Sequence, residues 1–175
     1  IQGLVPKKGQ SMFDVINQFA EVIEDIKKNP DTYKELRGVV QGGLGLKPSV
    51  IANWNNPYEE FDKALPKTDF NKTLTQYLDE NKKKTTGNVF YDEFLSLYPV
   101  FDMLGYKQDK LSEKNTHQNM TTDSHHAFYA AHCNYFVSID AKTIGKTKGV
   151  YQHFGVLTKV CKPDEFLKFI DSEIA

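Results

Sequence analysis

Two short β-rich runs joined by a helical stretch place the strongest constraint on the fold of this chain. Residues 135–139 and 156–160 are rich in β-branched and aromatic residues, and the residues from Ala141 to Phe154 between them suit a helix. Gly155 is expected to end that helix, and Pro163 to begin a last one. Strands connected through a helix lie parallel, and continuous apolar runs indicate burial on both faces. The sequence therefore predicts an α/β fold with a short parallel sheet.

The rest of the chain is predicted to be mostly helical. Apolar residues recur at helical spacing in several stretches, which predicts helices at residues 11–28, 32–40, 57–65, 69–80, 89–104 and 124–132. The lysine-rich residues 81–87 are expected to be a solvated loop, and the polar residues 106–122 a mobile connection. A length of 175 residues suits one domain. We therefore expect a single domain over residues 1–175, with a mostly helical part (1–105) and an αβαβα part (123–175).

The overall charge does not by itself indicate a nucleic-acid-binding protein. Lysine and arginine total 22 against 23 acidic residues, which gives a formal net charge of -1. Arg37 is the sole arginine in the sequence, so bidentate contacts to phosphate are disfavoured and lysines are the available cations. Any contact with a nucleic acid is therefore expected to be local and sensitive to salt.

Cysteine usage and hydropathy favour an intracellular protein. Cys133 and Cys161 lie in or beside apolar runs without a disulfide framework, and we expect both to be reduced and buried. No stretch approaches the roughly 18 consecutive apolar residues of a membrane span, and the first residues do not resemble a secretory leader. The expectation is a cytoplasmic protein that does not associate with a membrane.

Two carboxylates are predicted to meet at one edge of the sheet. Asp140 directly follows the first β-rich run, and Asp123 precedes the helix that leads into that run. Side chains placed after parallel strands point into the usual ligand site of an α/β fold. Together the two acids would hold a hard cation such as Mg²⁺ or Mn²⁺, which prefers oxygen ligands. The alternative is structural, with Asp123 as a helix N-cap and Asp140 as a turn acid.

Two other polar groupings match known sites poorly. His125, His132 and Cys133 lie close together in sequence, but their spacing fits no common structural zinc site. The glycine-rich residues 42–45 lack a following Lys-Ser/Thr pair and a preceding strand, which favours a turn over a phosphate-binding loop. The two acids are therefore the main candidates for chemistry.

The segment 122–140, TDSHHAFYAAHCNYFVSID, contains an acid before an alanine-rich helix, a strand, and a closing Ser-x-Asp. This order of acid, helix, strand and Ser-x-Asp resembles the metal-binding half of PIN domains. The resemblance continues at residues 150–151, 154–156, 158–160 and 163–167. The resemblance covers roughly residues 123–170, under a third of the chain. It implies a three-layer α/β/α fold with extra N-terminal helices, whose acids bind Mg²⁺ or Mn²⁺ and cleave RNA by hydrolysis.

The resemblance also assigns roles to residues of the motif. It implies that Asp123 and Asp140 are metal ligands and catalytic acids, and that Ser138 is the hydroxyl residue beside the second acid, near the substrate. The first acid of the family ends an N-terminal strand, and the N-terminal part of this sequence shows no such hydrophobic strand followed by Asp. The matched segment therefore supplies two acids of the expected cluster.

Further site residues are expected near this pair. Glu93 is the candidate for a catalytic acid on a middle helix, with Glu59 and Glu60 as alternatives, and His125 and His126 are candidates to contact substrate phosphate. The leading hypothesis is a PIN-like, Mg²⁺- or Mn²⁺-dependent ribonuclease. The alternatives are an inactive PIN-like module that binds RNA or a protein partner, and an unrelated α/β domain in which the acids only cap helices.

Overall fold

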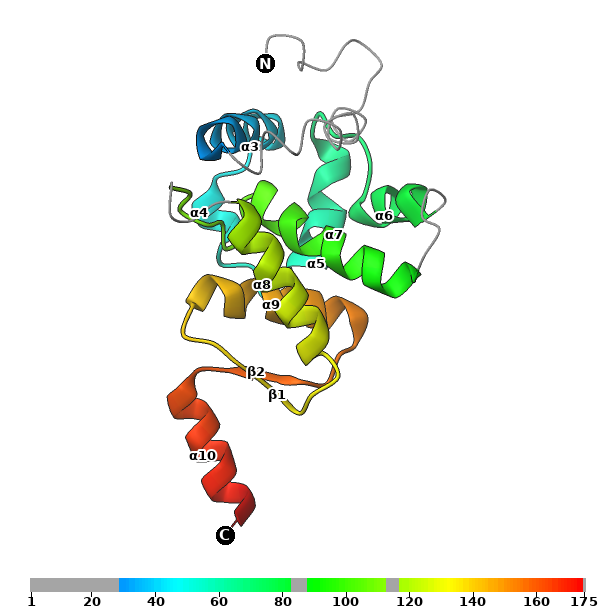
Figure 1. The fold of residues 1–175 in the computed structure, drawn as a ribbon. Helices are drawn as coiled ribbons and strands as arrows, with labels where there is room; N and C mark the ends of the chain where they lie inside the picture. The colour runs from blue at the N-terminus through cyan, green and yellow to red at the C-terminus, as the bar shows by residue number, and fades with distance from the viewer. Residues whose placement is uncertain (1–28, 83–87, 113–116, 175) are drawn as a thin grey trace.

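The computed structural model describes residues 29–82, 88–112 and 117–174, and over this range the protein is mostly helical (Figure 1). The predicted helix at residues 11–28 lies outside the described residues. Besides its helices, the described range contains a two-stranded parallel sheet, which agrees with the predicted α/β class. Within these residues no helix is both long enough and apolar enough to cross a membrane.

The elements follow one another along the chain. They are α3 (Pro30–Leu44), α4 (Pro48–Ile51), α5 (Pro57–Ala64), η1 (Leu65–Lys67), α6 (Leu74–Lys82), α7 (Val89–Met103), α8 (His117–Ala130), β1 (Tyr135–Val137), α9 (Ala141–Phe154), β2 (Lys159–Cys161) and α10 (Pro163–Ile174).

Helix ends in the N-terminal half follow from local capping chemistry. α3 begins at Pro30, after Asn29, whose side chain accepts hydrogen bonds from N–H groups of the first turn. α5 begins in the same way, with Pro57 after the capping residue Asn56. α3 ends at Leu44 and is capped by Gly45, which has the left-handed φ of 62° that glycine adopts without strain. Most of the glycine-rich stretch before Gly45 therefore belongs to the helix rather than to a turn.

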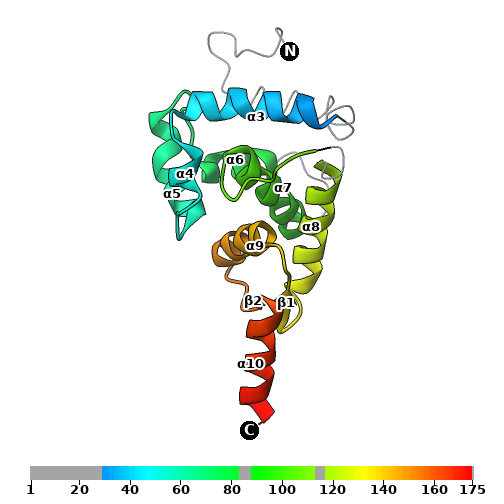
Figure 2. The ribbon, with the colours of Figure 1, turned by 90° about the vertical axis from the view of Figure 1, so that its left-hand side faces the viewer.

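α7 lies at the centre of the core, with α8 and α9 packed against it (Figure 2). Phe94 and Tyr98 on this helix are fully buried. The ring of Phe94 lies 5.5 Å from that of Phe128 on α8 and 6.0 Å from that of Tyr151 on α9. Large buried aromatic side chains contribute much of the apolar area in a core of this kind. This contact fixes α8 and α9 beside each other.

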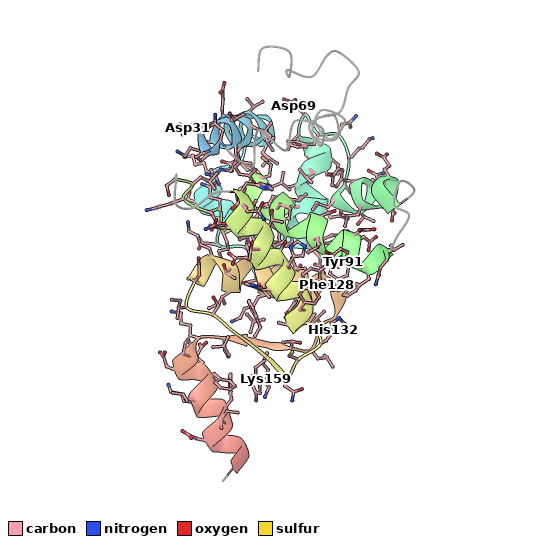
Figure 3. The ribbon with its side chains drawn as sticks, viewed as in Figure 1. Asp31, Asp69, Tyr91, Phe128, His132 and Lys159 are labelled. Atoms are coloured by element: carbon pink, nitrogen blue, oxygen red, sulfur yellow. The ribbon has the colours of Figure 1, made fainter. Side chains whose placement is uncertain are left out.

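The aromatic contact between α7 and α8 continues toward the sheet (Figure 3). Phe128 lies edge-on to Tyr91, with ring centroids 4.8 Å apart, and edge-on to His132 at 5.7 Å. Edge-to-face pairs of this kind add specific geometry to the area that they bury. They orient the C-terminal end of α8 over the start of β1.

β1 and β2 are parallel neighbours connected through α9, as the sequence predicts. Phe136 lies opposite Val160, and both side chains pack toward the helical core. The prediction that the strands are buried on both faces was wrong, because Val137 and Lys159 are exposed. The second strand also begins later than predicted. The N–H of Val156 donates to a carbonyl of α9 and completes the turn that ends that helix.

α10 covers the other side of β1 and then extends away from the body of the molecule (Figures 1 and 2). Tyr135 of β1 contacts Phe166 and Phe169 of this helix, with ring centroids 5.2 and 6.0 Å apart. The predicted helix start at Pro163 is confirmed. The short sheet therefore has α8 and α9 on one side and the first turns of α10 on the other.

The segment before β1 differs from the prediction. α8 begins at His117, well before the predicted start near Ser124, because Met120 and Phe128 extend one buried stripe along the helix. Residues 106–122 were predicted to be a mobile connection, but Tyr106 and Leu111 are buried in the core. Tertiary burial overrides the polar composition of this segment.

A close helix contact at Gly149 yields a stability prediction. A Cβ atom at this position of α9 would lie 2.7 Å from Cγ of Pro57 and 3.1 Å from Cε2 of Phe101. We expect Gly149→Ala to destabilise the protein by about 1–3 kcal/mol in urea denaturation, because neither neighbouring ring moves freely. Gly38→Ala is the matched control, since a Cβ there meets nothing within 4 Å and alanine favours the helix. Equal effects of the two substitutions would contradict the contact.

Candidate functional site

Asp140 caps α9 at the carboxyl end of β1. Its Oδ1 accepts hydrogen bonds from the N–H groups of Lys142 at 2.7 Å and of Thr143 at 3.3 Å. Its own N–H donates to Oγ of Ser138 at 3.1 Å, so the Ser-x-Asp motif forms a local turn. Asp140 was predicted, in its structural role, to be a turn acid, and in the structure it is the N-cap of α9. The residue itself remains exposed, and a carboxylate has a second oxygen available for other ligands.

Asp123 lies inside α8 and does not cap that helix, so its predicted role as an N-cap was wrong. Its Oδ2 accepts a hydrogen bond from Oγ1 of Thr143 on α9, at 3.0 Å. The side chain is only partly exposed. Asp123 thus joins α8 to the first turn of α9.

Thr143 brings the two acids together. Its hydroxyl donates to Asp123 and its backbone N–H donates to Asp140. The pKa of Asp123 is raised above 3.8, chiefly because burial disfavours the charged form; the negative charges of Asp109 and Asp140 raise it further. The hydrogen bond from Thr143 and the charge of Lys146 act in the opposite direction. The pair therefore carries a negative charge that its surroundings only partly compensate.

This raised pKa predicts a dependence of stability on pH. The folded protein binds the Asp123 proton more tightly than the unfolded chain, so stability falls as pH rises from 3.8 through the higher folded pKa. We expect Asp123→Asn, which can still accept from Thr143, to be more stable than wild type at pH 7 without metal. The difference should vanish below pH 3.8 in thermal melts, and a wild type more stable at pH 7 would contradict the raised pKa.

A buried ion network lies next to this pair. Lys146 of α9 is 0% exposed, and its Nζ lies 2.6 Å from Oδ2 of Asp109 and 3.5 Å from Oδ2 of Asp102. Asp102 also accepts from Arg37 at 3.0 Å and from the Tyr33 hydroxyl at 3.1 Å. The backbone N–H of Asp109 donates to Asp102, which fixes the loop after α7. These contacts tie α3, α7, the loop and α9 together.

Sequence reasoning missed this network, although the helical patterns contain a signal for it. Asp102 stands one turn beyond Tyr98 on the buried face of α7, and Lys146 stands one turn before Val150 on the buried face of α9. A charge on an apolar helix face requires a partner of opposite charge. The network also places Arg37, the sole arginine, inside the protein, where it does not serve as a surface cation for phosphate.

Two hydroxyl groups lie in the same region. Tyr98 Oη and Thr147 Oγ1 are buried and make no hydrogen bond of acceptable geometry with any described residue. Burial raises the pKa of Tyr98, while the neighbouring hydroxyls of Thr143 and Thr147 oppose that rise. The Tyr98 ring also faces Lys146, whose Nζ lies 5.0 Å from the ring centroid. The Tyr98 side chain therefore lies beside Lys146 of the ion network and beside Thr143 at the acid pair.

The histidines and cysteines of this segment differ in their exposure and in their hydrogen-bond partners. His125 Nδ1 lies 2.7 Å from the carbonyl of Thr121 and is held there as a donor, whereas His126 is exposed. Cys161 is buried as predicted, but Cys133 is exposed, so its predicted burial was wrong. The turn between α8 and β1 leaves Cys133 at the surface. Both thiols are free.

The glutamates proposed as further acids lie on other helices. Glu93 is a partly buried residue of α7, and the charges that act on Asp123 come instead from Lys146, Asp109 and Asp140. Glu59 and Glu60 lie on α5 and pair with Lys63 at 3.8 and 3.9 Å. These two acids therefore belong to a surface cluster on α5 rather than to the pair on Thr143.

The oxygen atoms around Thr143 suit a hard cation, but they are few. In the part of the chain that the structure describes, no group of three or more His, Cys, Asp or Glu residues is arranged to hold a metal ion. Mg²⁺ is commonly bound by one or two carboxylates, with water and substrate phosphate completing its coordination. The donor set of Asp123 and Asp140 fits that kind of site.

A scan against protein-family models gave no match, and searches of the curated proteins and of the solved structures gave none either.

Proposed function

We propose that the protein is a PIN-like ribonuclease that depends on Mg²⁺ or Mn²⁺, with Asp123 and Asp140 as its metal ligands. The observation that carries this proposal is the meeting of the two carboxylates on Thr143, at the carboxyl end of β1. The raised pKa of Asp123, which arises chiefly from burial and to a smaller extent from the charges of Asp109 and Asp140, supports it, because a bound cation would stabilise the charged carboxylate.

The layering around the sheet supports a PIN-like α/β/α fold in this proposal. Phe136 and Val160 pack toward the side of α8 and α9, whereas Tyr135 packs on α10. Helices therefore lie on both sides of the parallel strands, which is the arrangement that the resemblance implies.

The residues of the chain would have separate roles in the reaction. Thr143 donates a hydrogen bond to each of the two carboxylates, and Ser138 accepts one from the backbone N–H of Asp140. A bound cation would supply an activated water and neutralise charge on the phosphate. In this proposal Glu93 remains the candidate third acid, and exposed His126, with His125 beside it, would contact substrate phosphate.

A second function is favoured by the small number of acids. Asp140 already caps α9, and the described residues offer two acids at Thr143 rather than a larger cluster. A PIN-like module of this kind would bind RNA or a protein partner without cleaving it.

Cleavage of a fluorescent single-stranded RNA in Mn²⁺ distinguishes the two functions. We expect wild type to cleave it and Asp123→Asn to lose at least about 100-fold in rate, the scale on which one active-site electrostatic group acts. Asp164→Asn on α10 is the control for total charge, and its rate should equal that of wild type. RNA binding without cleavage by wild type would overturn the nuclease and support the module.

A further inference from the structure

The ion network and the acid pair are joined electrostatically as well as through packing. Lys146 contacts Asp109 and Asp102 directly, and its charge also acts on Asp123, as does that of Asp109. Thr143 and Lys146 stand one turn apart on the same buried face of α9. A change of charge in the network therefore changes the electrostatic potential at the carboxylates of Asp123 and Asp140.

The charges of the network balance one another. Lys146 and Arg37 supply two positive charges, and Asp102 and Asp109 supply two negative charges, all of them buried or nearly so. The network is therefore neutral, whereas Asp123 and Asp140 make no ion pair with any residue that the structure describes. An extra positive charge in the network would repel a cation at the pair, and an extra negative charge would attract it.

We propose that Lys146 and Asp109 are positioning residues that set the cation affinity of the Asp123–Asp140 pair through this charge balance, without contacting the cation. The inference rests on the proposed function, because it requires the pair to bind a divalent ion. Asp109 serves as a counter-charge for Lys146 rather than as a metal ligand. The neutral network would make the pair, and not the interior, the preferred site for the cation.

The test measures Mn²⁺ affinity by isothermal titration calorimetry in charge variants. Asp109→Asn keeps the shape of the side chain and an acceptor for Lys146, so it should fold while leaving one positive charge in excess. Its Mn²⁺ dissociation constant should rise by a factor of roughly four or more, the effect of a unit charge about 10 Å from a divalent ion even in water. Asp109→Asn/Lys146→Met restores neutrality and should return to within about twofold of wild type.

A second variant and a control complete the test. Arg37→Gln, at the edge of the network, leaves one negative charge in excess and should tighten Mn²⁺ binding, a reversal that general loss of structure does not produce. Asp164→Asn changes the total charge equally but lies on α10, and it should not alter the affinity. Equal effects of Asp109→Asn and Asp164→Asn, or weaker binding by both network variants, would overturn the inference. Absence of Mn²⁺ binding by wild type would instead overturn the proposed function and the inference with it.

Discussion

Replacing Lys146 with methionine is expected to lower the free energy of unfolding by about 3–5 kcal/mol in urea denaturation. The ammonium group is 0% exposed and is the contact that compensates Asp109 across the core. Its loss leaves Asp109 and part of the charge of Asp102 buried without a counter-charge. Most of this loss of stability comes from leaving the carboxylates buried and unpaired, rather than from losing the favourable energy of the ion pair itself.

Lys148 supplies the matched control on the same helix. This side chain is exposed, so Lys148→Met should change the free energy of unfolding by less than about 0.5 kcal/mol. The double substitution Lys146→Met/Asp109→Leu should recover part of the loss, because an apolar pair can replace a buried ion pair. Similar small effects of Lys146→Met and Lys148→Met would contradict the structural role of the network.

Divalent cations are expected to stabilise the protein through the acid pair. At a Mn²⁺ concentration of about 100 times the dissociation constant, mass action adds about 2.7 kcal/mol to the stability of the folded state. Asp140→Asn should abolish most of that gain in a thermal-shift measurement. The metal-free variant should still fold, because asparagine caps a helix as well as aspartate does.

The control for this experiment is the exposed acid Asp164 at the start of α10. Asp164→Asn removes the same charge away from Thr143, so its melting temperature should rise with Mn²⁺ as much as that of wild type. An identical response of wild type and Asp140→Asn would refute the metal site while leaving the capping role of Asp140 intact.

The βαβ unit was predictable because local sequence and tertiary structure agree there. The bounds of α9 match the prediction from Ala141 to Phe154, since Asp140 caps the start and Gly155 adopts a left-handed φ of 64° at the end. Parallel pairing of the two β-rich runs follows from their helical connection. Asp140 lies after β1 as expected, whereas Asp123, which was expected before the helix that leads into β1, lies within α8.

The missed features depend on contacts between residues far apart in sequence. Polar composition suggested a mobile connection at residues 106–122, but Asp109 in that segment is buried against Lys146. Nothing local indicates that Asp102 meets Arg37, 65 positions earlier in the chain. The exposure of Cys133 likewise depends on how the turn after α8 sits over β1. Periodicity identifies the buried face of a helix, but not the partner that faces it.

The most direct test of the central claim is a crystal structure with Mn²⁺, recorded with anomalous scattering from the metal. The account predicts an anomalous peak between the carboxylates of Asp123 and Asp140, beside Thr143, and no such peak in Asp123→Asn. A well-ordered structure of the wild type at saturating Mn²⁺ without a peak at this position would contradict it.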